Sequence, residues 1–251
     1  MTIHFRQNHM RSIDGERFVS TRSGLRPRTA VRVTIALAGI LASTRGVSAQ
    51  SSRHEAAAEF FLGTAWSVPL PLILEAPGNR LKFRARYSTR PLSDAPYYAY
   101  RAGIVRRARG GEVELVHHKL YLENPVPPIE HLEITHGYNL PMANLATPAG
   151  GWQLRIGLGF VVAHPEGRID GRPVRGVRRT LIGGGYHVAG GSMQLALGRR
   201  YPLGQGDVAL TVAPEAKLTA GVARVHLQQG TLIVPNIAVH VLGGLGVRRR
   251  W

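Results

Sequence analysis

The sequence contains no cysteine, few acidic residues and no long hydrophobic run. The missing cysteine excludes a disulfide framework and thiolate metal sites, so strand or helix packing alone must hold a folded domain together. The apolar run Val33–Ala42 has only ten residues, whereas a membrane-spanning helix needs about 20, and no later segment approaches that length. We therefore expect no helical membrane anchor.

The charge balance is strongly basic, because 32 basic residues against 15 acidic ones give a formal net charge of +17. Such a charge suits nucleic-acid binding. However, the basic residues are scattered, and neither a Lys/Arg-rich helix nor a nucleic-acid motif is present. Only three are lysines, as the codon usage of a GC-rich genome would also produce (Lys82, Lys119 and Lys217). We expect no nucleic-acid partner, and anionic lipopolysaccharide is a better match for the arginines.

The first fifty residues have the pattern of a secretory signal peptide. The apolar run Val33–Ala42 follows three arginines and precedes Val47-Ser48-Ala49, a small-residue cleavage pattern before Gln50. An exported chain without a helical anchor is either soluble or a membrane barrel. The predicted divisions are a polar leader or over-extended start at 1–30, a signal peptide at 31–49, a short N-terminal segment at 50–57 and the folded domain at 58–251.

The remainder of the chain is a succession of strand-length runs separated by Gly, Pro, Asn and Asp clusters, which predicts an all-β, antiparallel, up-and-down fold. We count ten runs, although Gly190-Gly191 could be a hairpin turn or a bulge inside one long strand, so eight or nine remain possible. The predicted runs are 59–69, 80–90, 97–107, 112–123, 129–141, 151–163, 179–189, 192–202, 207–223 and 234–250.

The final strand carries the most specific pattern, because apolar residues alternate with small or polar ones before the chain stops on Trp251. This end resembles the closing strand of a small bacterial outer-membrane β-barrel, and the architectural resemblance covers about 58–251. The resemblance implies that the insertion machinery reads Trp251. Arg249 departs from the pattern, because an apolar residue is usual there. One predicted face holds Ile237, Val239, Val241, Leu245 and Val247, and the other holds Ala238, His240, Gly244, Gly246 and Arg248.

The same alternation in other runs predicts a polar interior. In the run 151–163, Trp152, Leu154, Ile156, Leu158, Phe160 and Val162 share the predicted lipid-facing side. The basic residues predicted to face the lumen are Lys82, Arg84, Arg86, Arg101 and Arg155. Neither Gly183-Gly184-Gly185 nor the histidine pair His117-His118 has the context of a phosphate loop or a metal site, so we expect no cofactor and no metal.

The runs 112–123 and 129–141 hold the densest set of ionisable residues. If the hairpin pairs residues whose numbers sum to 252, Lys119 faces Glu133, provided that the first strand bulges near Val116. Lys119 and Glu133 would then form an ion pair inside the lumen. The same register places Tyr121 opposite His131 and His117 opposite Thr135.

A histidine beside a carboxylate and a hydroxyl is also the raw material of acyl transfer, with His117, His131, Glu133, Thr135 and Tyr121 as candidates. A structural network is the favoured interpretation, because the analogy with lipid A-modifying barrels rests on fold alone.

Three functions remain open for an exported protein of the outer membrane. The first is a structural or surface-interaction barrel, which we favour. The second is a lipid A-modifying acyl hydrolase or acyltransferase. The third, a narrow anion-permeable channel, ranks last because side chains fill a barrel of eight to ten strands. The expected partners are outer-membrane lipid and lipopolysaccharide, and we expect a monomer.

Overall fold

The computed structural model describes residues 54–93, 96–174 and 185–251. The predicted leader and signal peptide lie outside the described residues. Within the described part the chain is all-β and antiparallel, which confirms the predicted class, and no helix there is long and apolar enough to cross a membrane. The strands are β1 (His54–Ser67), β2 (Leu70–Ala76), β3 (Asn79–Ala85), β4 (Tyr87–Ser88), β5 (Tyr98–Arg106), β6 (Arg109–Leu122), β7 (Ile129–Ala149), β8 (Trp152–Ala163), β9 (Glu166–Ile169), β10 (Arg172–Pro173), β11 (His187–Gly198), β12 (Tyr201–Leu203), β13 (Val208–Leu227) and β14 (Gly230–Arg250).

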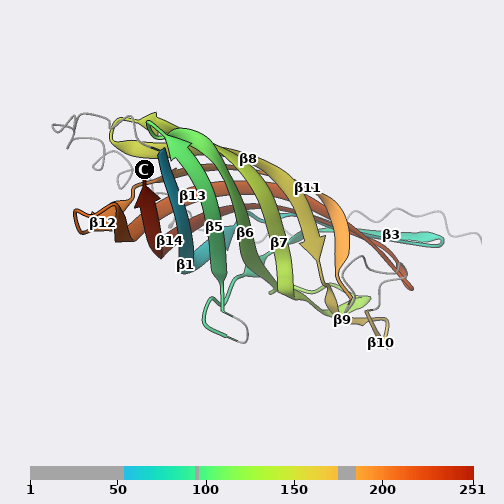
Figure 1. The fold of residues 1–251 in the computed structure, drawn as a ribbon. Helices are drawn as coiled ribbons and strands as arrows, with labels where there is room; N and C mark the ends of the chain where they lie inside the picture. The colour runs from blue at the N-terminus through green and yellow to red at the C-terminus, as the bar shows by residue number, and fades with distance from the viewer. Residues whose placement is uncertain (1–53, 94–95, 175–184) are drawn as a thin grey trace, which may run out of the picture. The chain divides into compact units, whose positions relative to one another are not determined.

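Eight of these strands pair in a closed cycle, which we call the ring (Figure 1). The antiparallel order is β1, β5, β6, β7, β8, β11, β13 and β14, and β14 pairs again with β1. The predicted run 80–90 is not part of the ring, since it forms β3 and β4. The described parts of runs 179–189 and 192–202 fall mainly in the single strand β11, whose register shifts between Val188 and Gly190. Gly190-Gly191 is therefore at a bulge, not a hairpin turn.

The two ends of the ring differ in their connections. The terminal end, where β1 begins and β14 ends, has the connection 199–207, which carries β12, and two-residue turns at Arg107-Ala108 and Gly150-Gly151. All four turn residues have positive φ, the geometry that two-residue hairpins favour. The loop end carries the long connections 68–97 and 164–186.

Strands β13 and β14 continue beyond the ring at the loop end, where the β2–β3 hairpin pairs with β14 and β9 pairs with β7. We call this part the apolar extension. Its interior is a conventional hydrophobic core, because both sides of the enclosed space are lined by aliphatic side chains. These side chains include Leu72, Leu74, Leu120, Leu132, Ile134, Ile169, Val225, Leu232 and Val234.

Within the ring the two faces of each strand have opposite character. On β8, Ile156, Leu158 and Phe160 are exposed, whereas Gln153 and Arg155 are buried, which confirms the predicted alternation. In the final strand, β14, the residues of the predicted apolar face are more exposed than those of the predicted small or polar face, which are mostly buried. Polar side chains therefore fill the inside of the ring while apolar side chains cover its outside.

Candidate functional site

A charged network occupies the middle of the ring. The Arg101 guanidinium lies 2.5 Å from a Glu215 carboxylate oxygen and 2.9 Å from a Glu59 oxygen. Arg155 lies 2.5 Å from Glu112 and 3.1 Å from the same Glu215 oxygen. All five side chains are almost fully buried. Glu59 is the cross-strand partner of Arg101, whereas Glu215 comes from β13, which pairs with neither β5 nor β8. Closure of the ring therefore brings Glu215 to both arginines.

Two further layers extend this network along the interior. On the loop-end side, the Lys217 ammonium pairs with Glu114, to which Asn144 and Gln194 donate at 2.8 and 2.6 Å. At the terminal end, Glu55 lies 2.8 Å from Arg200 and 2.9 Å from Arg250. Five carboxylates therefore face six cations among the described interior residues. The acids are Glu55, Glu59, Glu112, Glu114 and Glu215, and the bases are Arg101, Arg155, Arg200, Lys217, Arg248 and Arg250.

The prediction of five basic lumen residues is correct for Arg101 and Arg155 and wrong for Lys82, Arg84 and Arg86. The last three are exposed on β3 and just after it, outside the ring. Their strand alternates as predicted, but it pairs with β2 and so never lines the interior. Alternation identifies the face of a strand, and it does not identify which sheet partner that strand takes.

A cluster of tyrosine, histidine, threonine and serine side chains lies where the ring meets the apolar extension. The Tyr97 hydroxyl is 2.6 Å from His240 Nδ1, and the Thr219 hydroxyl is 2.8 Å from His240 Nε2. The His118 ring packs edge-on against His240, with centroids 5.1 Å apart, and its Nε2 is 3.5 Å from the Ser67 hydroxyl. Sequence analysis had placed His240 on the inner face but did not link it to His118 or Tyr97, which lie 122 or more residues away.

The predicted register of the β6–β7 hairpin is wrong. Tyr121 pairs with Glu133 rather than with His131, and His117 pairs with Asn139 rather than with Thr135. The register shifts between His118 and Leu120, where β7 advances four residues while β6 advances two. The irregularity therefore lies on the second strand and not near Val116 on the first, as predicted. These two extra residues of β7 change every pairing on the far side of the shift.

Lys119 lies at this irregularity and is not the cross-strand neighbour of Glu133. Its ammonium donates to the backbone carbonyl oxygens of Arg90 and Ser93, in the connection that follows β4. Glu133 is partly exposed, and its carboxylate lies 3.7 Å from His131 Nε2. The proposed lumen ion pair is therefore replaced by two separate interactions.

The candidate acyl-transfer residues are only partly brought together. His131 lies beside Glu133, which pairs with Tyr121. His117 instead bonds Asn139 at 2.8 Å and stacks on Tyr98, with ring centroids 4.6 Å apart. The remaining candidate, Thr135, is buried. This arrangement provides a histidine–carboxylate pair with Tyr121 on the neighbouring strand, and it leaves His117 with other partners.

Charged groups at the loop end form separate local pairs. Glu123, in the β6–β7 connection, accepts a hydrogen bond from the Ser88 hydroxyl and lies 3.1 Å from the Arg90 guanidinium. The hydrogen bond from Ser88 is the largest cause that lowers the pKa of the Glu123 carboxyl, and the hydrogen bond from Arg90 is the second. In the part of the chain that the structure describes, no group of three or more His, Cys, Asp or Glu side chains could hold a metal ion.

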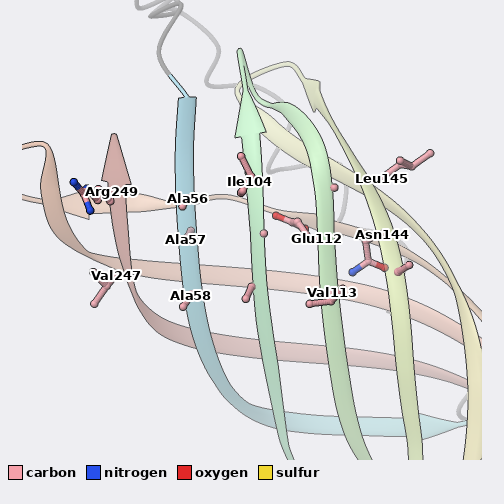
Figure 2. A pocket seen from close by; sticks show the side chains of 14 residues that line it. Ala56, Ala57, Ala58, Ile104, Glu112, Val113, Asn144, Leu145, Val247 and Arg249 are labelled. Atoms are coloured by element: carbon pink, nitrogen blue, oxygen red, sulfur yellow. The ribbon is translucent and has the colours of Figure 1, made fainter. Parts of the chain in front are cut away.

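A groove of about 960 Å³ lies on the outside of the ring near its terminal end (Figure 2). Its floor consists of small residues on β1, β5, β6 and β7. Val247 stands at one side and Leu145 at the other, while Arg249 lies at the terminal end of the groove. The lining is mostly apolar, and its polar members are Arg249, Glu112 and Asn144. The side chains of Glu112 and Asn144 bond Arg155 and Glu114 inside the ring. The small residues of the groove are Ala56, Ala57, Ala58, Ala102, Gly103, Gly111 and Ala143.

The sequence matches no protein-family model, and no curated protein is significantly similar to it. The function must therefore be inferred from the arrangement of the side chains.

Proposed function

We propose that the mature chain is a transmembrane β-barrel of a Gram-negative outer membrane with a structural or surface-interaction role. One observation carries this proposal: the closed ring is apolar outside and charged inside. Leu145, Leu158 and Leu245 are 74%, 65% and 66% exposed. In water this exposed belt would be unfavourable, whereas in hydrocarbon the same surface is well solvated.

The dimensions and the edges of the ring support a membrane location. Strands β1, β6, β8 and β11 have 12 to 14 residues, enough to cross a bilayer at the tilt typical of barrel strands. Exposed aromatic side chains lie towards both ends, with Trp66 at the loop end and Tyr201 and Trp251 at the terminal end. Such positions suit the interfaces between hydrocarbon and headgroups.

The connections support one orientation. In outer-membrane barrels short turns face the periplasm and longer loops face outwards. By this rule the terminal end faces the periplasm and the apolar extension faces the lipopolysaccharide. Trp251 would then be available to the insertion machinery at the periplasmic edge, where its backbone bonds His54 at 3.0 and 3.1 Å.

The interior favours a structural role over the two alternatives. Paired carboxylates neutralise the buried arginines that an anion channel would need to leave free. The acyl-transfer hypothesis needs its candidate residues at one site, whereas His117 pairs with Asn139 instead of Thr135 and does not join the His131–Glu133 pair. The filled, internally paired lumen is what a structural barrel requires.

The test is expression of the full chain in a Gram-negative host, followed by membrane fractionation and N-terminal sequencing. We expect a product that begins at Gln50, fractionates with outer membranes and migrates faster on gels before heating than after it. Recovery of the uncleaved chain from the cytoplasm would refute the proposal.

A further inference from the structure

The groove on the outer face of the ring differs from the rest of the apolar belt in both shape and charge. Elsewhere large side chains such as Leu158 and Leu210 stand out from the strands. Over β1, β5 and β6 the outward residues Ala56, Ala58 and Ala102 leave a hollow instead. A hollow in a hydrocarbon-facing surface can accept an acyl chain more deeply than a flat wall can.

The cation at the end of this hollow has no partner among the residues that the structure describes. Arg248 and Arg250 turn inwards to Glu55, at 3.7 and 2.9 Å. Arg249, between them, turns outwards, and no hydrogen bond or ion pair with another described residue engages its guanidinium. Of these three consecutive arginines, the first and the third therefore belong to the interior network and the second lines the groove.

Two further arginines lie closer to the terminal end of the ring than Arg249 does. Arg106 and Arg109 are exposed and directly paired across the β5–β6 turn, and no acid among the described residues forms an ion pair with either. Like charges opposite each other repel, so this arrangement is relieved by a bound anion. Arg249 on β14 pairs with Ala56 on β1, and Ala56 pairs with Ile104 on β5. Arg106 follows two residues after Ile104 on the same strand, so Arg249 and Arg106 are two strands apart.

We infer that this groove is a binding site for one anionic glycerophospholipid. The phosphate lies against Arg249 with Arg106 and Arg109 nearby, and an acyl chain lies over the alanines towards the middle of the membrane. The inference rests on the proposed membrane function. It favours a glycerophospholipid over lipopolysaccharide, because the groove is at the terminal end, which the proposed orientation places in the periplasmic leaflet.

The test uses the protein purified from host membranes and reconstituted in phosphatidylcholine vesicles. Insertion is established first, by quenching of tryptophan fluorescence with brominated phosphatidylcholine. Spin-labelled phosphatidylglycerol or phosphatidylcholine is then added, and the fraction of immobilised label gives the relative association of each lipid. We expect phosphatidylglycerol to be preferred about fivefold, since one arginine near a membrane surface contributes roughly this factor.

Two variants separate the headgroup from the chain. Arg249→Gln should bring the preference close to 1, and Ala102→Leu should lower the immobilised fraction of phosphatidylglycerol by filling the floor of the groove. Arg224→Gln is the matched control, because Arg224 is an exposed arginine at the loop end, paired with Glu75. Its preference should equal that of the unaltered protein.

Several outcomes would overturn the inference. Insertion with no preference, or a preference that survives both variants, would show that the groove selects no lipid. A dimer that both variants dissociate, with lipid preference unchanged, would assign the groove to a second copy of the chain. A preference for spin-labelled lipopolysaccharide that Arg249→Gln abolishes would reverse the assigned leaflet. Failure to insert would instead refute the proposed function, and the groove with it.

Discussion

The ring and the apolar extension are built partly from the same strands, yet they bury opposite kinds of side chain. Along β13 the inward residues are Glu215, Lys217 and Thr219 inside the ring, and then Ala223 and Val225 in the extension. The outward residues change in the opposite sense, from Leu218 and Val222 to Arg224 and His226. One strand thus exchanges the polarity of its two faces within about five residues.

Under the proposed membrane location, this exchange corresponds to a change in the surroundings of the protein. In the extension, polar residues face out and apolar residues face in, the arrangement that water favours. In the ring the order is reversed, and the buried charges are tolerated because they pair with one another. The change from Val222 to Arg224 therefore marks the expected outer boundary of the hydrocarbon.

The largest effect is expected from a single change inside the ring. Glu215→Gln keeps the volume of the side chain but leaves Arg101 and Arg155 without a shared carboxylate. We expect unfolding to become easier by about 4 kcal/mol, the scale of breaking one partner of a buried pair. Urea titration in vesicles measures this. A fall in the free energy of unfolding of less than about 1 kcal/mol would mean that water solvates the charges inside the ring, contrary to their burial in the structure.

A truncation in the extension should act through packing instead of charge. Leu72→Ala removes a fully buried side chain and should cost about 3 kcal/mol. Because this core lies beyond the ring, protease cleavage in the β2–β3 hairpin should increase while the ring stays folded. Equal loss of the heat-modifiable form would show that the two regions unfold together.

Arginine on the outside of the ring tests the membrane directly. Leu158→Arg should cost at least about 2 kcal/mol if residue 158 lies near the bilayer midplane. Leu92→Arg provides the control, because Leu92 is 88% exposed in the loop-end connection and should tolerate the change. Similar folding yields for both variants would contradict a lipid-facing wall.

The smallest effect concerns an exposed charge outside the ring. The pKa of Glu123 is lowered by its bonds to Ser88 and Arg90, so the ionised carboxylate favours the folded loop. This contribution is complete above the ordinary carboxyl pKa of about 4.3 and disappears as the pH falls through the lower folded value. Carboxyl NMR titration should show the lowered pKa. Ser88→Ala should raise it, and an unchanged pKa would contradict the assigned cause.

The groove also differs from the rest of the outer wall. Its residues are recognisable in the sequence, but the sequence does not show that they lie together. The departure at Arg249 was visible in the closing strand, and so were the alanines of β1. Their meeting with Ala102 and Ala143 depends on four neighbouring strands of the ring.

The sequence by itself determined the all-β class and the two faces of strands such as β8 and β14. This was possible because side chains alternate with a period of two, whatever the partner strand. The tertiary structure alone decided the position of the β6–β7 bulge, the place of Lys82, Arg84 and Arg86 outside the ring, and the carboxylates that neutralise Arg101. These depend on strand pairing between distant segments, in which a shift of one residue reverses every side chain, and no local pattern records which partner closes the ring.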